Sequence, residues 1–277
     1  MSSAQSDSVT VSRILDVVET LWPVSGAESW DTPGLQLGSR RHPVSRVLLS
    51  VDVTPEVIRE ARAIGAELVI CHHPLFLRGL HSVTEDSDRG ALVGLALDAG
   101  LSVIAAHTNA DVVTEGVSDV LARALNLQSV VPLVEGESSE SGLGRYGTLS
   151  KPASLKELAV RLAEILPATV SGIRVSGAPE AVISSVALCG GAGDSLLSTA
   201  LVANSDVYIT SDLRHHPALD AGIRAELGLG PHVIDISHWA SESLWLAVAA
   251  RELTAAVPGC EFVLSEVRTD PWAFTVA

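Results

Sequence analysis

Short apolar runs alternate with longer amphipathic segments along this chain, a pattern typical of strands alternating with helices. Between Val9 and Leu21 apolar residues recur at helical spacing, and either Thr10 or Ser12 suits the N-cap. Thr54-Pro55-Glu56 opens a second helix, which we expect to end near Gly65. This helix lies between two apolar runs, Arg46–Asp52 and Leu68–Cys71, so the three segments predict a β-α-β unit with parallel strands.

The same order of elements recurs in the last third of the chain, where a strand, a helix, a strand and a His-His-Pro sequence precede another strand that ends in histidine. We therefore expect an α/β fold of two related lobes with layered sheets, packed as one globular unit with the metal site between the lobes. The predicted limits are 1–135 for the N-terminal lobe, 136–180 for a connecting segment that belongs to the second lobe, and 181–277 for the C-terminal lobe. Further predicted elements are helices at 90–99, 117–125, 155–166 and 195–202, strands at 101–106, 172–177, 185–189, 206–210 and 231–236, and a Glu/Ser/Gly-rich linker or exposed loop at 130–141.

Composition limits the class of protein. Hydrophobic residues make up 47% of the 277 residues and the mean hydropathy is +0.34, so the chain is globular and can bury a full core. No apolar run reaches the roughly 18 residues that a membrane helix needs, and the polar segment Met1–Ser8 does not resemble a signal peptide. Three scattered cysteines exclude a disulfide framework. We expect a cytoplasmic protein without membrane contact.

The net charge of −15 argues against nucleic acid as a partner, because an acidic surface repels phosphate backbones. A carboxylate-rich site would instead attract metal cations, and the bound cations would then attract a small anionic substrate.

The strongest chemical signal is His72-His73-Pro74, which follows directly after the apolar run that ends at Cys71. Open α/β sheets bind ligands at the carboxyl ends of their strands, and two adjacent imidazoles there supply two nitrogen ligands. Adjacent residues of a regular strand point to opposite faces, so the backbone must turn at the strand end for both rings to reach metal. We predict His72 and His73 as metal ligands.

Two further sets of candidate ligands lie in similar places. Asp111 follows the predicted strand that ends at His107, and we expect Asp111 to bind metal and His107 to orient a ligand or a water. His238 and Glu242 are spaced i, i+4, so a helix capped by Ser237 would place both on one face. Three imidazoles and two carboxylates are a suitable set for two closely spaced divalent ions.

The second His-His-Pro sequence and a glycine-rich loop leave alternatives open. His215 and His216 either line the same cavity in a catalytic or supporting role or are a structural relic of the duplication. Gly190, Gly191 and Gly193 follow a predicted strand and could present backbone N–H groups to a substrate anion, although we favour a tight turn as the reason for these glycines.

The ordered set of segments resembles the Nif-three-like family of dinuclear metal-centre hexamers, also named GTP cyclohydrolase 1 type 2 homologues. The residues that carry the resemblance span most of the chain: Asp31–Gly38, Cys71–Leu75, His107–Asp111, Gly142–Arg145, Cys189–Gly191, Asp206–Asp212 with His215 and His216, and Ser237-His238 with Glu242. The resemblance implies two divalent ions held by His72, His73, Asp111, His238 and Glu242, two similar α/β lobes, and a toroidal homohexamer. It also shows two departures, Thr32 and Ser237, where the family usually has Asn and Gly.

We therefore predict a dinuclear metal-binding protein that acts as a metal-dependent hydrolase on a nucleotide or another phosphoester-type substrate. The alternative is a non-catalytic metal-binding ring or scaffold for metal handling or protein interaction. Imidazole and carboxylate ligands favour zinc or iron, with manganese as a third choice.

Overall fold

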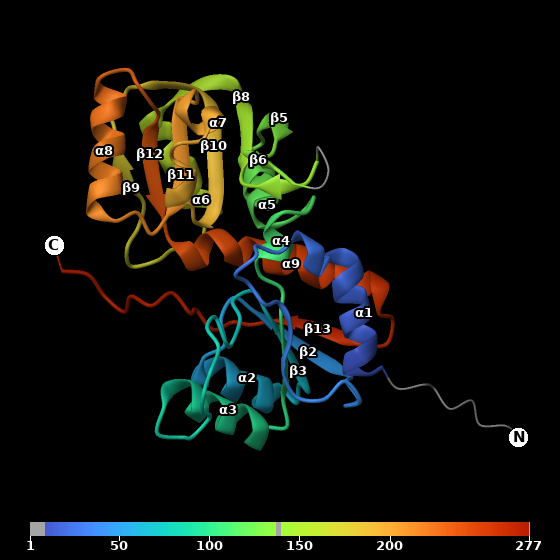
Figure 1. Ribbon diagram of the computed structural model, residues 1–277. Helices are drawn as coiled ribbons and strands as arrows, with labels where there is room; N and C mark the ends of the chain where they lie inside the picture. Colours follow the sequence, from blue (N-terminus) through green and yellow to red (C-terminus); the bar gives the residue numbers. More distant parts are fainter. Residues whose placement is uncertain (1–8, 137–139, 277) are drawn as a thin grey trace, which may run out of the picture. The chain divides into compact units, whose positions relative to one another are not determined.

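The computed structural model describes residues 9–136 and 140–276 (Figure 1). The polar segment 1–8 and residues 137–139 of the predicted linker lie outside the described residues. The chain divides into two compact units. The first contains the residues up to Ala110 together with Leu246–Thr269, and the second contains Asp111–Trp245 together with the segment from Asp270.

The first unit is built on a five-stranded sheet in which four neighbouring strands are parallel. An antiparallel strand at one edge completes the sheet, so its order is β1-β4-β3-β2-β13. The predicted parallel pairing of the first β-α-β unit is confirmed. The strands are β1 (Gly34–Leu37), β2 (Arg46–Ser50), β3 (Leu68–Cys71), β4 (Ser102–Ala105) and β13 (Glu261–Leu264).

Alternate residues of these buried strands face opposite layers of helices. Leu48, Val69 and Val103 pack in one cluster with residues of the helices on the first face. Figure 1 shows α2 and α3 on this face of the sheet, with α1 on the other. The helices of this unit are α1 (Val11–Leu21), a 3-10 turn η1 (Val24–Gly26), α2 (Pro55–Ile64) and α3 (Asp88–Asp98), and α4 (Thr108–Asp111) and α9 (His238–Ala256) are shared with the second unit.

The residues predicted to cap or end the helices of the first unit do so in the structure. Thr10 caps α1 by accepting a hydrogen bond from Arg13 N. Thr54 caps α2, whose first residue is Pro55, and Gly65 ends it in the left-handed conformation that glycine adopts without strain. Local sequence chemistry therefore sets the ends of both helices.

The second unit is built on a six-stranded sheet of order β5-β8-β10-β11-β12-β9. Its central strands β10, β11 and β12 are parallel, and the outer strands pair antiparallel to their neighbours. The strands are β5 (Gln128–Val131), β8 (Arg145–Ser154), β9 (Arg174–Ser176), β10 (Val182–Ala192), β11 (Val207–Ser211) and β12 (His232–Ile236), and a separate pair is formed by β6 (Val134–Glu135) and β7 (Gly142–Leu143).

Helices cover both faces of this sheet (Figure 1). Leu158, Leu162 and Leu188 belong to a core cluster that joins α5 and α6 to one face. Two smaller clusters join α7 and α8 to the other face. Ser154 and Glu157 form a capping box at the start of α6. The helices are α5 (Val117–Ala124), α6 (Leu155–Ile165), a 3-10 turn η2 (Asp194–Leu196), α7 (Ala200–Ala203) and α8 (His215–Glu226).

The two sheets repeat one arrangement, as the sequence predicts. The spatial order β4-β3-β2 in the first unit corresponds to β12-β11-β10 in the second, and a histidine follows both β4 and β12. The predicted lobe limits stay a prediction. Two strands pair with a sheet from the other side of these limits. β5 belongs to the second sheet although it precedes residue 136, and β13 pairs with β2 although it follows residue 180.

Two predicted elements differ from the structure. The helix predicted over 195–202 is broken into η2 and the short α7, and the backbone N–H groups of Leu196, Leu197 and Thr199 donate to carbonyls three residues earlier, the tighter 3-10 pattern. The predicted linker 130–141 contains the end of β5 and all of β6, which pairs with β7. The strands there are short and exposed, so they lack the hydrophobic alternation that would reveal them.

Within the described ranges, the structure contains no helix that is both long enough and apolar enough to cross a membrane. All three cysteines are unpaired and buried, as expected from their spacing.

Candidate metal centre

His72 and His73 extend the backbone ladder of β3 beyond its last residue. The N–H groups of His72 and His73 donate to Ser50 O and Val51 O at 3.1 and 2.8 Å. Their side chains then lean toward different neighbouring strands. His72 Nδ1 donates to Ala106 O at 2.9 Å, and His73 Nδ1 donates to Asp52 Oδ1 at 2.7 Å. Both acceptors are oxygens without hydrogen, so Nε2 is the unprotonated nitrogen of each ring, the form that ligates metals.

His107 joins these two rings at the end of β4. The ring centroid of His107 lies 5.3 Å from that of His72 and 5.5 Å from that of His73. One ligand nitrogen from each of the three residues lies within 4.8 Å of the others. We call His72, His73 and His107 the first ligand group, and this group could hold a metal ion.

Asp31 fixes the orientation of His107. Its Oδ2 lies 3.0 Å from His107 Nδ1, although the approach is not aligned as a hydrogen bond, and it accepts hydrogen bonds from Thr108 N at 3.1 Å and Thr108 Oγ at 2.6 Å. Burial raises the pKa of Asp31, but the contacts with His107 and Thr108 outweigh it and lower the pKa to about 2. Asp31 is therefore a carboxylate at neutral pH and favours the Nδ1–H form of His107.

Asp52 supports His73 in the same way and has a further partner. Its second oxygen, Oδ2, accepts a hydrogen bond from Thr269 Oγ. A chain of contacts therefore leads from Thr269 through Asp52 to the imidazole of His73. Such carboxylate–histidine pairs orient metal ligands and increase their basicity.

His238 and Glu242 form a second ligand group on the first turns of α9. Ser237 accepts a hydrogen bond from Ala240 N at 3.2 Å, which confirms it as the helix cap. His238 Nδ1 donates to Asp212 Oδ2 at 2.7 Å, and His238 Nε2 lies 2.8 Å from Glu242 Oε1. Two ligands held at ~2.1 Å from one ion at a right angle lie about 3 Å apart, so this pair has the separation of two ligands of one metal.

Gly191 forms one wall of the second ligand group. A Cβ atom at this position would lie 2.6 Å from Glu242 Oε1 and 3.3 Å from His238 Nε2, and the backbone has φ +71°. The N–H of Gly191 donates to Ser241 Oγ at 3.0 Å, which holds the glycine against α9. Only glycine leaves space at this point for the carboxylate and the imidazole.

Asp111, the last residue of α4, lies in the same electrostatic environment as Glu242. Burial, with the charges of Asp111 and Glu242, raises the pKa of Cys189 to about 12. Both carboxylates therefore lie near one buried thiol. Glu242 is only 3% exposed, and a buried carboxylate is stable only when paired with a cation or with hydrogen-bond donors.

The donor chemistry of both groups fits a divalent metal. Three imidazoles, His72, His73 and His238, each have Nδ1 bound to an oxygen, so Nε2 is the ring nitrogen that each would offer to a metal. Borderline ions such as zinc and iron prefer this combination of imidazole and carboxylate. Each carboxylate–imidazole contact also supplies the outer support that metal ligands generally have.

Comparison with known proteins places the chain in a family. The sequence profile of Duf34/NIF3 (NGG1p interacting factor 3) matches residues 9–271. The chain belongs to the Duf34/NIF3 family.

Relatives in this family carry a common name. A "GTP cyclohydrolase 1 type 2 homolog" of Streptomyces coelicolor is 42% identical over 274 residues, covering 96% of this chain and 95% of the relative. Its namesake from Mycobacterium tuberculosis is 30% identical over 373 residues, covering 96% of this chain and 97% of the relative. That alignment is longer than the 277 residues of this chain, so the mycobacterial relative carries additional residues.

Solved structures share the fold. A Bacillus cereus protein related to NIF3 has a TM-score of 0.87 at 23% identity, covering 98% of this chain and all of the other. A Staphylococcus aureus hypothetical protein has a TM-score of 0.86 at 25% identity, with 97% and 100% coverage. The mixed α/β fold with layered sheets is thus that of Duf34/NIF3 proteins.

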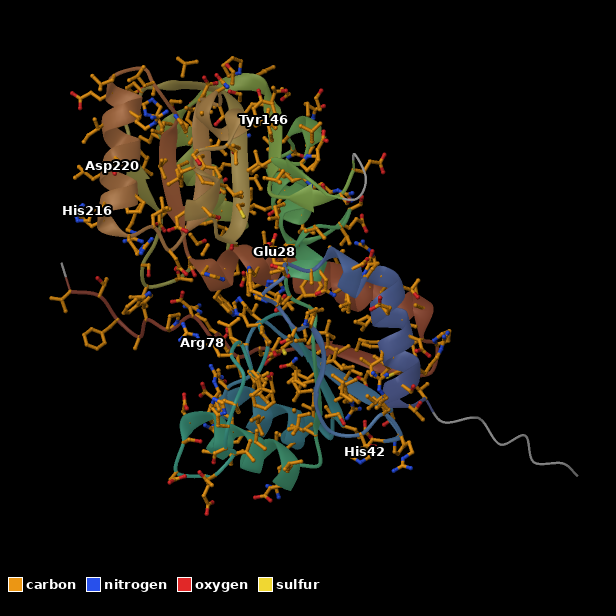
Figure 2. All side chains as sticks on the ribbon, viewed as in Figure 1. Glu28, His42, Arg78, Tyr146, His216 and Asp220 are labelled. Carbon is orange, nitrogen blue, oxygen red and sulfur yellow. The ribbon has the colours of Figure 1, made fainter. Side chains whose placement is uncertain are left out.

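The second His-His-Pro sequence lies in a different setting from the first. His215 and His216 begin α8, where both side chains are exposed and their ring centroids lie 5.2 Å apart. Figure 2 shows His216 and Asp220 on the outer side of this helix. The predicted catalytic or supporting role of the pair stays a prediction.

The glycine-rich segment forms the end of β10 rather than a phosphate loop. Gly190 N donates to Ser118 Oγ at 3.1 Å and Gly191 N donates to Ser241 Oγ at 3.0 Å. A Cβ atom at Gly193 would lie 2.3 Å from the hydroxyl of Tyr208. These two amides are used within the protein, so the structure favours close packing over anion binding as the reason for the glycines.

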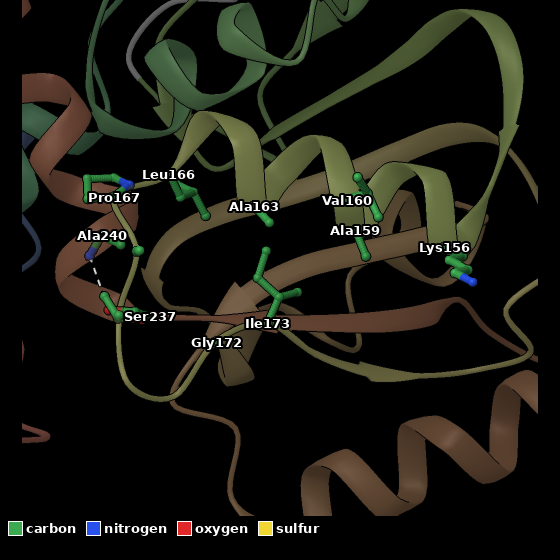
Figure 3. A pocket seen from close by; sticks show the side chains of 12 residues that line it. Lys156, Ala159, Val160, Ala163, Leu166, Pro167, Gly172, Ile173, Ser237 and Ala240 are labelled. Atoms are coloured by element: carbon green, nitrogen blue, oxygen red, sulfur yellow. Dashed lines mark hydrogen bonds between the residues drawn. The ribbon is translucent and has the colours of Figure 1, made fainter. Parts of the chain in front are cut away.

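A cavity of about 380 Å³ lies in the second unit beside α6 (Figure 3). Its walls are mainly apolar, with Val160, Leu166 and Ile173 as the larger side chains and Lys156 at one end. Ser237, the cap of α9, also contributes to the wall. The sequence patterns gave no indication of this cavity.

Three supporting carboxylates, Asp31, Asp52 and Asp212, were not predicted as site residues. A signal for Asp52 does exist, because it follows β2, the parallel neighbour of β3, so the ends of both strands meet at one edge of the sheet. Asp212 likewise follows β11, and its left-handed backbone at φ 58° turns the chain there. Asp31 lies in a turn before β1, and only the fold brings it to His107.

Proposed function

We propose that this protein is a metal-dependent hydrolase that holds two divalent ions through His72, His73, Asp111, His238 and Glu242. The observation that carries the proposal is the orientation of the three imidazoles, whose Nδ1 atoms donate to fixed oxygens, so that Nε2 is the nitrogen each ring offers to a metal. In His238 this nitrogen faces Glu242 Oε1 at 2.8 Å. We favour zinc or iron, followed by manganese, on the basis of the nitrogen and oxygen donors.

Two bound divalent ions would supply a hydroxide-like water near neutral pH and stabilise negative charge on a substrate oxygen. The side chains of the chain would prepare the site for this chemistry. Asp52 and Asp212 hold His73 and His238 in one tautomer. His107, whose Nδ1 faces the ionised Asp31 and whose ring lies beside those of His72 and His73, would orient a ligand or a water.

We propose a nucleotide or another small phosphoester as substrate. The name shared by the relatives refers to GTP, and the net charge of −15 means that an anionic substrate would need local cations to approach this protein. Bound metal ions would provide that positive charge.

We also propose a homohexamer, in line with the family resemblance of the sequence. Light scattering should then give a mass about six times the 28.9 kDa of one chain. A monomeric mass that does not change with concentration would contradict this part of the proposal.

The test combines metal analysis with a substrate screen. Protein purified without chelator is analysed for metals and incubated with GTP, other nucleotides and model phosphodiesters. We expect about two metals per chain, and we expect His238→Ala to lose metal and turnover. His81→Ala serves as the matched control, because His81 is an exposed imidazole that belongs to neither ligand group.

Each outcome separates the candidate functions. Metal with turnover that His238→Ala abolishes supports the hydrolase. Two metals without turnover on any compound favour the alternative, a non-catalytic metal-binding ring or scaffold. A wild-type protein that takes up no divalent metal would overturn both.

A further inference from the structure

The chain segment directly after Asp111 has little regular structure of its own. α4 ends at Asp111 and α5 begins at Val117, and Glu115 between them adopts the left-handed conformation with φ 62°. A non-glycine residue keeps this conformation only when the surroundings hold it. The position of Asp111 therefore depends on contacts that fix residues 112–116.

Arg145 makes one of these contacts directly and binds two residues that make others. Its side chain is 2% exposed, and its guanidinium donates from Nη2 to Val113 O at 2.9 Å. The same group donates from Nη1 to Gly142 O and Gly144 O, both at 2.7 Å, which folds it back onto its own backbone. The planar fork of arginine allows one side chain to reach all three carbonyls.

Asp119 and Gly142 complete the clamp. Asp119 Oδ1 accepts from Arg145 Nε at 3.2 Å, and its Oδ2 accepts from Glu115 N at 2.9 Å. Gly142 N donates to Val112 O at 2.7 Å. Three of the first four residues after Asp111 are thus tied to Arg145 or to a residue that Arg145 binds.

The glycines of the Gly142-Leu143-Gly144-Arg145 motif make this arrangement possible. A Cβ atom at Gly142 would lie 2.0 Å from Val134 O, and one at Gly144 would lie 2.6 Å from Leu133 Cδ1. Both glycines also have positive φ, at 143° and 61°. The motif therefore encodes a tight backbone turn that brings the guanidinium to the Asp111 segment.

A buried arginine is costly in a purely structural role, because an apolar side chain can often replace a buried ion pair without loss of stability. Arg145 also acts on the same electrostatic environment as the site. The charges of Asp111, Glu242 and Arg145 all influence the buried thiol of Cys189. The cation and two of the carboxylates to which we assign metal binding therefore act on the same buried thiol.

We propose that Arg145 is a positioning residue for Asp111, which holds the carboxylate in place for metal through the 112–116 segment. This inference rests on the proposed function, in which Asp111 is a metal ligand. It assigns a role to the Gly142-Leu143-Gly144-Arg145 motif, whose residues belong to neither ligand group.

The test uses Arg145→Lys, which keeps the positive charge but lacks the fork, and Arg161→Lys as its matched control. Arg161 is an exposed arginine on α6 and belongs to no part of the clamp, whereas Arg123 binds both Glu115 and Asp119 and is unsuitable. Co²⁺ affinity is measured by the visible absorption of the bound ion, together with circular dichroism of the metal-free proteins. We expect at least about tenfold weaker Co²⁺ binding for Arg145→Lys, and a change below about twofold for Arg161→Lys.

A double-mutant cycle with Asp111→Ala distinguishes positioning from general stability. If Arg145 acts through Asp111, Arg145→Lys should weaken Co²⁺ binding no further in the Asp111→Ala background. Should Arg145→Lys fail to fold, Asp119→Asn tests the same clamp from its other side and should also weaken Co²⁺ binding.

The outcomes are separable from those of the proposed function. Unchanged Co²⁺ affinity in Arg145→Lys, or equal losses in Arg145→Lys and Arg161→Lys, overturns the inference while the metal centre stands. Additive losses in the Asp111→Ala background also overturn it. A wild-type protein that binds no Co²⁺ overturns the inference and the proposed function together.

Discussion

Gly191→Ala tests the geometry of the second ligand group most directly. The added Cβ would lie 2.6 Å from Glu242 Oε1, closer than real Cβ atoms approach another atom, and 3.3 Å from His238 Nε2. Glu242 is buried, so its carboxylate has little space to retreat. A displacement of roughly half an ångström is already enough to spoil the geometry of a binding site.

Two effects of this substitution can be separated. Alanine at φ +71° pays about 1 kcal/mol for the left-handed backbone, which lowers the free energy of unfolding. Displacement of Glu242 should additionally weaken metal binding by at least about tenfold, which corresponds to about 1.4 kcal/mol. Gly228→Ala is the matched control, because Gly228 has φ +68° and no atom within 4 Å of an added Cβ.

The assay is competitive Zn²⁺ titration of both metal-free variants, with urea unfolding of the same samples. We expect both variants to lose similar unfolding free energy and only Gly191→Ala to lose Zn²⁺ affinity. Zn²⁺ affinity of Gly191→Ala within about twofold of wild type would refute the assignment of Glu242 and His238 as ligands. Equal loss of affinity in Gly228→Ala would attribute the effect to backbone strain instead.

Three further predictions concern other parts of the chain. Asp52→Asn should weaken Zn²⁺ binding about 10- to 100-fold, because the amide replaces the carboxylate that receives the Nδ1 proton of His73; unchanged affinity in the titration would show that this contact does not tune the ligand. Burial raises the pKa of Glu67, but two backbone N–H groups and a serine hydroxyl outweigh it and lower the pKa below the ordinary 4.5. Its carboxylate therefore stabilises the fold above about pH 4.5, and this contribution is lost as the pH falls through the folded-state pKa. Glu67→Gln should therefore lose less unfolding free energy than wild type between pH 5 and pH 3. Parallel pH profiles of the two proteins would contradict this linkage. Ser154→Ala should lower the free energy of unfolding by about 1 kcal/mol in urea, because it removes the capping box with Glu157, and no change would mean that the α6 cap is dispensable.

Helix ends and buried strands were predicted most accurately where local chemistry decides them. Thr54, Pro55 and Gly65 set the limits of α2 by capping, fixed φ and left-handed backbone, all of which are properties of single residues. The continuous helix predicted over 195–202 was wrong, because the backbone there forms 3-10 hydrogen bonds before the short α7. The spacing of apolar residues does not distinguish these two kinds of helical turn.

Candidate ligands that directly follow a strand could be predicted from the sequence. His72 and His73 follow β3 and His107 follows β4, and parallel neighbours bring their carboxyl ends to one edge of the sheet. The supporting acceptors were mostly missed. Asp31 reaches His107 across 76 positions of sequence, and Thr269 reaches Asp52 across 217, so no local pattern connects either pair.

The sequence by itself determined the α/β class, the repeated order of elements and the residue types available for metal, since these follow from hydrophobic period, capping residues and the side chains at strand ends. Only the tertiary structure decided which sheet β5 and β13 join, which carboxylate orients each imidazole, and why Gly191 must lack a side chain. The physical reason is the range of the interactions. Caps and periodicity act within a few residues, whereas a hydrogen bond to Nδ1 or a steric contact at Glu242 depends on distances that chain folding alone establishes.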